Sequence, residues 1–135
     1  MKFILSFILV VSIFGCKKTI ENIQKNIVID AMTNGQWKVI IYKEGSTDRT
    51  GEFLNYAFQF YEANAVEAYY SGNLEKTGSW SADTEAKTIT AYFNTNNTPL
   101  NLLNGTWKVV DNSWTFVEVT QEVNGTLHVL RIEKI

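Results

Sequence analysis

Apolar and polar positions alternate along most of the chain beyond residue 35. Eight short segments show this pattern: 37–42, 56–61, 66–70, 74–81, 88–93, 107–110, 114–120 and 127–133. Each segment is rich in β-branched and aromatic residues, which is typical of strands with one buried face. The pattern therefore predicts an all-β domain of eight strands.

The segments between these predicted strands are mostly short and carry turn-forming residues. Asn124-Gly125 predicts a two-residue hairpin, because both residues tolerate the positive φ angles of a type I′ turn. Residues 71–73, 82–85 and 111–113 are also suited to short turns. Residues 44–51 and 94–99 are longer and polar, and we expect the first of these to be a mobile loop at an open end of the domain.

Short connections between consecutive strands predict an antiparallel, up-and-down sheet. An open sheet of this size leaves two unpaired edges, and closure into an eight-stranded barrel removes them. A two-sheet sandwich is the alternative, although its crossovers need longer connections. We therefore expect an up-and-down β-barrel over residues 34–135.

The segment before the predicted barrel has helical spacing. Ile20, Ile23, Ile27 and Ala31 lie three or four residues apart, and Gly35 is suited to end a helix. The spacing predicts a short helix packed on the barrel, preceded by a tether. The alternative is a flexible tether throughout residues 16–33.

The first sixteen residues have the composition of an export signal. One lysine is followed by the apolar run 3–14, which is too short to span a membrane. The run leads into the tetrapeptide Ile13-Phe14-Gly15-Cys16. The tetrapeptide resembles a bacterial lipobox, which implies a lipoprotein signal peptide over residues 1–15 and a diacylglycerol on the sulfur of Cys16. The protein would then be attached to the membrane by this lipid. An ordinary cysteine, with cleavage elsewhere, is the alternative.

The residue after the lipobox bears on location. Lys17 stands where a signal for retention in the inner membrane usually places aspartate. The resemblance to lipoproteins therefore implies anchoring in the bacterial cell envelope, at the outer membrane.

Charge and residue chemistry narrow the functional classes. Lys and Arg number 12 against 14 Asp and Glu, a net charge of −2, so no binding of nucleic acid is expected. His128 is the only histidine, and a metal ligand or general base needs partners, so we expect no metal site, no cofactor and no catalytic residue. An enzyme is a weaker alternative that requires a buried carboxylate. The candidates for it are Glu62, Glu67 and Glu118.

Aromatic residues offer the remaining candidate site. Phe, Tyr and Trp number 8, 6 and 4. Strand parity places one row inward, where it either lines a cup for a small hydrophobic ligand or fills the core. This row consists of Tyr56, Phe58, Phe60, Tyr70, Ile89, Ala91 and Phe93. If the barrel is filled, the outward aromatics Tyr42, Tyr61, Tyr69 and Tyr92 are candidates for a protein-binding patch.

Two parts of the sequence carry a family resemblance. Gly35-Gln36-Trp37, at the start of the first predicted strand, is similar to the entry signature of lipocalins and the wider calycin group. This triplet is followed in turn by residues 56–60, 78–80 and 107–110. The succession of these segments resembles that in the lipocalin-like domain of lipoproteins from Bacteroidetes-type bacteria.

The resemblance implies a monomeric, calycin-like barrel that binds or carries a small hydrophobic ligand. Gly35 and Trp37 would close one end of it, and Arg131 on the last strand would pack over the indole of Trp37. An exposed Arg131 is the alternative for that residue. For the function, the alternative is a ligand-free barrel that acts as a protein-interaction or structural module of the envelope.

One hexapeptide occurs twice. Residues 34–39, Asn-Gly-Gln-Trp-Lys-Val, recur at 104–109 with threonine in place of glutamine. We interpret the repeat as two independent strand starts. Because strands one and six of an up-and-down sheet run in opposite directions, the two tryptophans are expected toward opposite ends of the barrel.

Overall fold

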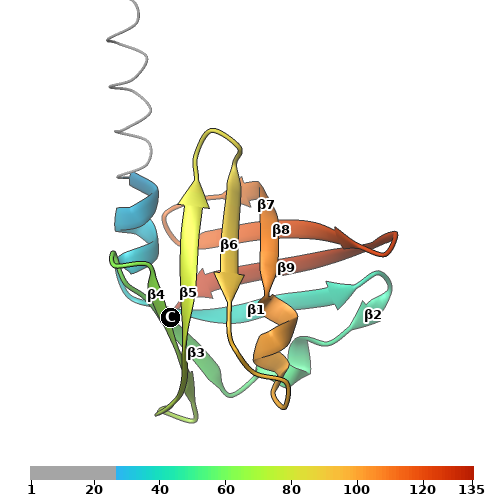
Figure 1. Ribbon diagram of the computed structural model, residues 1–135, viewed down its shortest axis with the longest axis horizontal. Helices are drawn as coiled ribbons and strands as arrows, with labels where there is room; N and C mark the ends of the chain where they lie inside the picture. Colours follow the sequence, from blue (N-terminus) through green and yellow to red (C-terminus); the bar gives the residue numbers. More distant parts are fainter. Residues whose placement is uncertain (1–26) are drawn as a thin grey trace, which may run out of the picture.

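The structure is a computed structural model that describes residues 27–135 (Figure 1). The predicted signal peptide, Cys16 and the tether lie outside the described residues. Residues 27–33 form an α-helix, called here the N-terminal helix, and no helix in the described part of the chain is long and apolar enough to cross a membrane. The other elements are β1 (Gln36–Glu44), β2 (Thr47–Asp48), η1 (Thr50–Phe53), β3 (Tyr56–Phe60), β4 (Ala65–Tyr70), β5 (Asn73–Asp83), β6 (Thr88–Tyr92), η2 (Pro99–Leu103), β7 (Gly105–Asn112), β8 (Phe116–Val123) and β9 (Thr126–Lys134).

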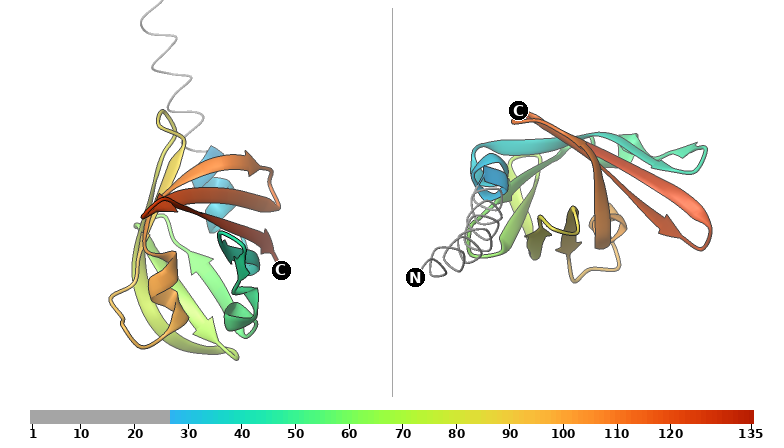
Figure 2. Two further views of the ribbon diagram at one scale, coloured as in Figure 1. Left: turned by 90° about the vertical axis from the view of Figure 1, so that its right-hand side faces the viewer. Right: turned by 90° about the horizontal axis from the view of Figure 1, so that it is seen from above.

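Eight of these strands close into an antiparallel barrel. The pairing order is β1-β3-β4-β5-β6-β7-β8-β9, and β9 pairs back onto β1, while β2 is attached to the outer end of β1. Figure 2 shows the same strands from the side and from above. The all-β, eight-stranded antiparallel barrel predicted from the sequence is confirmed, and the sandwich is rejected.

The contact between β1 and β3 is short. Only Gln36 with Gln59 and Trp37 with Phe58 are paired across it, whereas β1 pairs with β9 from Trp37 to Glu44. Beyond Trp37 the two strands diverge, as Figure 1 shows. η1 packs against β1 beside this divergence, and its Phe53 is 1% exposed.

A β-bulge in β1 changes which side chains face inward. The pairing with β9 shifts register between Val39 and Ile41, so the alternation of faces changes phase there. Trp37, Val39 and Tyr42 are all buried, and Tyr42 is 1% exposed. The expectation that Tyr42 belongs to an outward aromatic patch is therefore wrong, because it is a core residue.

The polar segment after β1 is folded, and the prediction of a mobile loop at an open end is wrong. The segment contains β2 and η1. Arg49 forms ion pairs with Glu44, at 2.9 Å, and with Glu52. The hydroxyl of Thr50 accepts a hydrogen bond of 2.8 Å from the backbone N–H of Tyr42. These contacts fasten the segment to β1.

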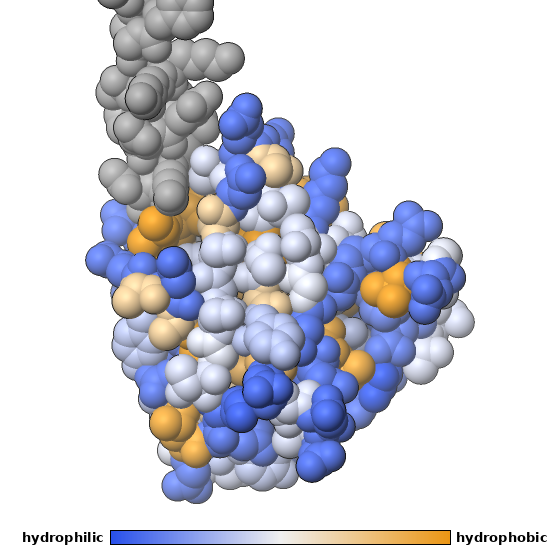
Figure 3. Space-filling model, viewed as in Figure 1, coloured by the Kyte–Doolittle hydropathy of each residue, from blue (hydrophilic) through white to orange (hydrophobic). Residues whose placement is uncertain are grey.

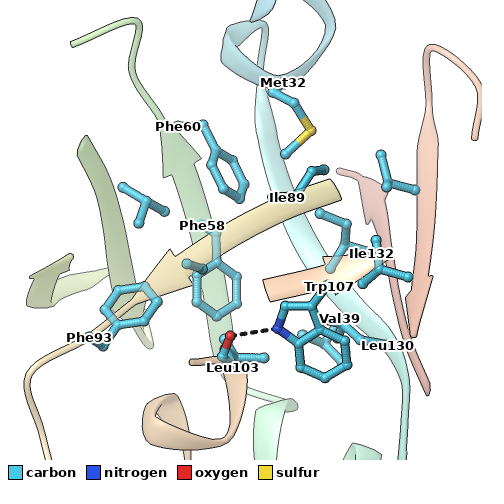
Figure 4. Close-up of a pocket in the computed structure, with 14 residues that line it drawn as sticks. Met32, Val39, Phe58, Phe60, Ile89, Phe93, Leu103, Trp107, Leu130 and Ile132 are labelled. Atoms are coloured by element: carbon cyan, nitrogen blue, oxygen red, sulfur yellow. Dashed lines mark hydrogen bonds between the residues drawn. The ribbon is translucent and has the colours of Figure 1, made fainter. Parts of the chain in front are cut away.

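Two helices cover opposite ends of the barrel interior. Met32 of the N-terminal helix is 2% exposed, and Leu100 and Leu103 of η2 are also buried. In Figure 4, Met32 lies above the interior and Leu103 below it. The core between them is formed by the inward faces of the strands.

The repeated hexapeptide marks the junctions between these helices and the strands that follow. Gly35 and Gly105 adopt positive φ angles of 86° and 124°, which glycine reaches at little cost. Two residues later, the indole Nε1–H of Trp37 donates to the carbonyl of Met32 and that of Trp107 to Leu103, both at 2.9 Å. Carbonyls at a helix end lack partners within the helix, so each tryptophan ties one helix to the barrel.

Candidate ligand-binding site

The barrel encloses a small apolar cavity of about 60 Å³ (Figure 4). Side chains from the N-terminal helix, η2 and most of the strands surround it, and all of them are apolar. The only side-chain donor among them, the indole N–H of Trp107, is already bonded to Leu103. The lining residues are Met32, Val39, Phe58, Phe60, Val66, Ile89, Ala91, Phe93, Leu103, Trp107, Val117, Val119, Leu130 and Ile132.

The cavity is small compared with ordinary ligand sites. Pockets for drug-sized ligands measure about 300–1,000 Å³. At about 60 Å³, the interior in this conformation is at least fivefold smaller than such a pocket. Aromatic rings occupy much of the rest, with the centroids of Phe58 and Phe93 6.3 Å apart. A ligand chain can enter the interior only if a side chain moves.

Five of the seven predicted ligand residues line this cavity. These are Phe58, Phe60, Ile89, Ala91 and Phe93. Tyr56 is buried outside the cavity lining, between the rings of Phe53 and Phe58, and burial raises the pKa of its hydroxyl above the ordinary value. Tyr70 is 44% exposed and packs edge-on against Tyr56.

Sequence reasoning missed the aliphatic side of the cavity. Val117 and Val119 of β8, and Leu130 and Ile132 of β9, line it as well. Their alternation with polar residues was visible in the sequence and indicates the inward face. Met32 carried no such signal, because its place over the barrel depends on how the N-terminal helix packs.

A larger groove of about 460 Å³ lies beside the N-terminal helix. Apolar side chains of the helix, β6, β7 and β8 form one part of its lining, and the β5–β6 and β7–β8 turns add polar side chains. Figure 3 shows apolar surface gathered where the described helix begins. The groove is lined by Ile27, Val28, Ala31, Met32, Ala82, Asp83, Thr84, Lys87, Thr88, Ile89, Val109, Val110, Asn112, Ser113 and Val117.

The groove and the interior cavity share part of their lining. Met32, Ile89 and Val117 line both. Met32 is 2% exposed, and Figure 4 shows its side chain pointing from the helix toward the interior. The two spaces are therefore separated by single side chains.

Lys87 stands at the polar side of the groove in a strained turn. Its φ angle is 57°, a left-handed conformation that non-glycine residues seldom adopt. Its carbonyl accepts a hydrogen bond from Val109 at 2.8 Å, while the nearby carboxylate of Asp83 accepts one from the backbone of Ala86 at 3.0 Å. Within residues 27–135, the Lys87 ammonium forms no ion pair.

Arg131 does not lie over Trp37. Its guanidinium carbon is 4.0 Å from the ring centroid of Phe116, and the Nζ of Lys134 lies 5.3 Å from the ring of Trp37. The register between β1 and β9 explains the difference, because Trp37 pairs with Lys134 and Arg131 pairs with Ile41. The cation over the entry tryptophan is thus a lysine three residues further along β9.

The other polar residues considered as candidates for a metal site or for catalysis make contacts of a structural kind. His128 packs edge-on to Tyr42 at 6.4 Å between ring centroids, and no cluster of three metal-ligating side chains occurs in residues 27–135. Glu67 accepts a hydrogen bond of 3.1 Å from Tyr69. Burial, and then the charge of Glu44, raises the pKa of Tyr42 to about 12.

Comparisons with known proteins support the fold. No family model matches the chain, and no curated protein matches it. A crystal structure of a DUF4847 family protein from Bacteroides vulgatus is similar with a TM-score of 0.56 and 14% identity, over 78% of this chain and 96% of that one. A crystal structure of an uncharacterized protein from Bacteroides eggerthii is similar with a TM-score of 0.46 and 17% identity, over 75% of this chain and 98% of that one. The first likeness shows a shared fold and nothing finer.

Proposed function

We propose that this protein is a lipid-anchored lipoprotein of the bacterial cell envelope whose barrel binds a small hydrophobic molecule without altering it. The observation that carries the proposal is the pairing of an entirely apolar interior with an adjoining groove of ligand size. At about 460 Å³ the groove falls within the range of small-molecule sites. Its apolar part suits a hydrocarbon surface, and its polar side suits one polar end.

The driving force would be burial of apolar ligand surface. At about 25 cal/mol per Å², covering roughly 200 Å² of ligand contributes about 5 kcal/mol before the cost of association. Displacing packed side chains such as Met32 reduces this gain. We therefore expect moderate affinity for single-chain or flat apolar molecules.

The proposed anchor and the groove are close along the chain. Ten residues separate Cys16 from Ile27, and the eleven Cα–Cα steps between the two span at most about 40 Å when fully extended. Because Ile27 itself lines the groove, the groove lies at the end of the domain nearest the proposed membrane attachment. This placement suits a protein that exchanges an apolar molecule with a bilayer.

Native mass spectrometry tests ligand binding most directly. The chain from residue 17 onward contains every described element; it would be exported behind a cleavable signal peptide that has no lipobox, and purified gently from a Bacteroides-type cell. We expect an additional mass that leaves on denaturation and identifies the ligand's chemical class. A bare polypeptide, with no fluorescence response to N-phenyl-1-naphthylamine, would refute ligand binding and favour the filled barrel as a protein-interaction module.

Lipid anchoring is tested separately on the full-length chain. We expect radiolabelled palmitate to be incorporated and the protein to fractionate with the outer membrane. Cys16→Ala should abolish incorporation, whereas Lys17→Asp should retain it and move the protein to the inner membrane. Labelling that persists in Cys16→Ala would contradict the assignment of the lipidation site.

A further inference from the structure

We infer that the groove is the entrance to the barrel interior, that the Met32 side chain is its movable plug, and that the ligand is an amphiphile with one apolar chain and an anionic end. The inference rests on the proposed function and specifies its route and ligand class. Three observations carry it: the shared lining, the contrast between the barrel ends, and the position of Lys87.

The shared lining leaves one mobile element between groove and interior. Of the three residues that line both spaces, Ile89 and Val117 are β-branched and lie on strands paired on both sides, so their side chains have few alternatives. Met32 is unbranched and has three rotatable bonds. Rotation of its side chain joins the groove to the cavity without breaking a strand pair.

The backbone of Met32 is held by a contact that does not involve its side chain. Its carbonyl accepts the indole N–H of Trp37 at 2.9 Å, and Trp37 is itself fully buried. The helix therefore stays in place when the thioether rotates. A plug of this kind opens and closes without unfolding the end of the barrel.

The opposite end of the barrel is fastened by hydrogen bonds. The side chain of Asn104 accepts from the backbone N–H of Phe93 at 2.6 Å and donates to its carbonyl at 2.9 Å. The hydroxyl of Tyr42 donates to the carbonyl of Leu102 at 3.1 Å. Opening this end requires breaking several such bonds, so the entrance lies at the N-terminal helix.

The polar side of the groove indicates the charge of the ligand's head. Lys87 lies there with a positive φ angle, although asparagine or glycine adopts this conformation at lower cost. The single carboxylate in the lining, Asp83, accepts a backbone hydrogen bond of its own turn. Lys87 is the single cation in the lining and forms no ion pair with the described residues, so it would favour an anionic head.

Stopped-flow binding of the neutral probe N-phenyl-1-naphthylamine tests the entrance. Ala31→Trp places bulk in the groove, since Ala31 lines only the groove, and should slow association by about fivefold or more, which is a barrier increase of about 1 kcal/mol. The control, Ala63→Trp, lies in the exposed turn between β3 and β4 and should leave the rate unchanged. Equal rates for the two variants would overturn the entrance.

Cavity-enlarging variants at the two ends test the plug. Met32→Ala and Leu103→Ala each remove a lining side chain, but only Met32 also lines the groove. Met32→Ala should speed association, and Leu103→Ala should not. Met32→Ile, with a stiffer side chain of similar size, should slow it while keeping the fold. Equal acceleration by both alanine variants would overturn the role of Met32.

Comparing an anionic with a neutral probe tests the head group. Lys87→Gln should weaken binding of 1-anilinonaphthalene-8-sulfonate by about threefold, the size of one partly exposed ion pair, and leave N-phenyl-1-naphthylamine unaffected. Lys108→Gln, on the exposed face of β7 outside both linings, is the control. If Lys87→Gln weakens binding of both probes equally, or of neither, the prediction of an anionic head is refuted.

The outcomes separate the inference from the proposed function. If the wild-type protein and Met32→Ala both fail to bind either probe, ligand binding itself is refuted. If the wild-type protein binds and Ala31→Trp binds at the same rate, ligand binding stands and the entrance is wrong.

Discussion

Gly78 lies at a point where the barrel wall leaves no room for a side chain. A methyl group at this position would come within 2.5 Å of the carbonyl oxygen of Tyr92 and 2.7 Å of a ring carbon of Phe93. The carbonyl belongs to β6, whose Tyr92 pairs with Ser79, the next residue of β5. Gly78→Ala must therefore strain the β5–β6 ladder and push Phe93 toward the interior cavity.

Overpacking of this kind costs about 1–3 kcal/mol. In a domain of this size each kcal/mol lowers the melting temperature by roughly 4 °C, so we expect a decrease of about 4–12 °C in thermal unfolding followed by circular dichroism. Gly51→Ala is the matched control, because its added methyl group meets nothing within 4 Å and the residue has no positive φ. If Gly78→Ala melts no lower than Gly51→Ala, the close approach does not matter and the argument is refuted.

Two further predictions concern the junctions and the buried tyrosine. Trp37→Phe leaves the Met32 carbonyl without its indole donor, and should lower the free energy of unfolding, measured in urea, by about 1–3 kcal/mol. The control is Trp114→Phe, at an exposed position. An equal loss in both variants would contradict the role of the Trp37–Met32 hydrogen bond. Because burial raises the pKa of Tyr42 to about 12 from 10.0 in the unfolded chain, the unfolded state ionises first, and stability should be intact below pH 10 and fall between pH 10 and 12. Tyr42→Phe should make this alkaline decrease shallower in urea titrations at each pH, and an unchanged slope would contradict the assignment.

The filled interior places a condition on any ligand of this barrel. With only about 60 Å³ free, a bound chain replaces contacts that Met32 and its neighbours already make. The net gain is the apolar ligand surface removed from water, less the cost of those lost contacts. A barrel of this kind favours a thin single chain or a flat ring over a bulky, branched molecule.

Much of the fold was predictable from local pattern. β3, β4 and β6 coincide closely with the alternating segments 56–61, 66–70 and 88–93, because a strand with one buried face must alternate. The inward placement of Phe58, Phe60 and Phe93 follows from the same parity. The Asn124-Gly125 turn joins β8 to β9, with both residues at positive φ.

Other features depend on partners distant in the sequence. The bulge in β1 exists only in its pairing with β9, and it turns Tyr42 inward against the local alternation. The same pairing places Lys134, and not Arg131, over Trp37. The two strands are far apart in the sequence, so the register between them could not be predicted from the local pattern of either strand.

The sequence by itself determined the strand pattern and the apolar character of the inward face, because these follow from the period of side chains along each strand, and its short connections predicted an up-and-down barrel. Only the tertiary structure decided the size of the cavity and the existence of the groove. The groove forms where the N-terminal helix, the β5–β6 turn, β7 and β8 meet, and its volume depends on how closely these segments pack. Such packing involves side chains that barrel closure brings together from distant parts of the sequence. The local period of apolar residues therefore cannot predict it.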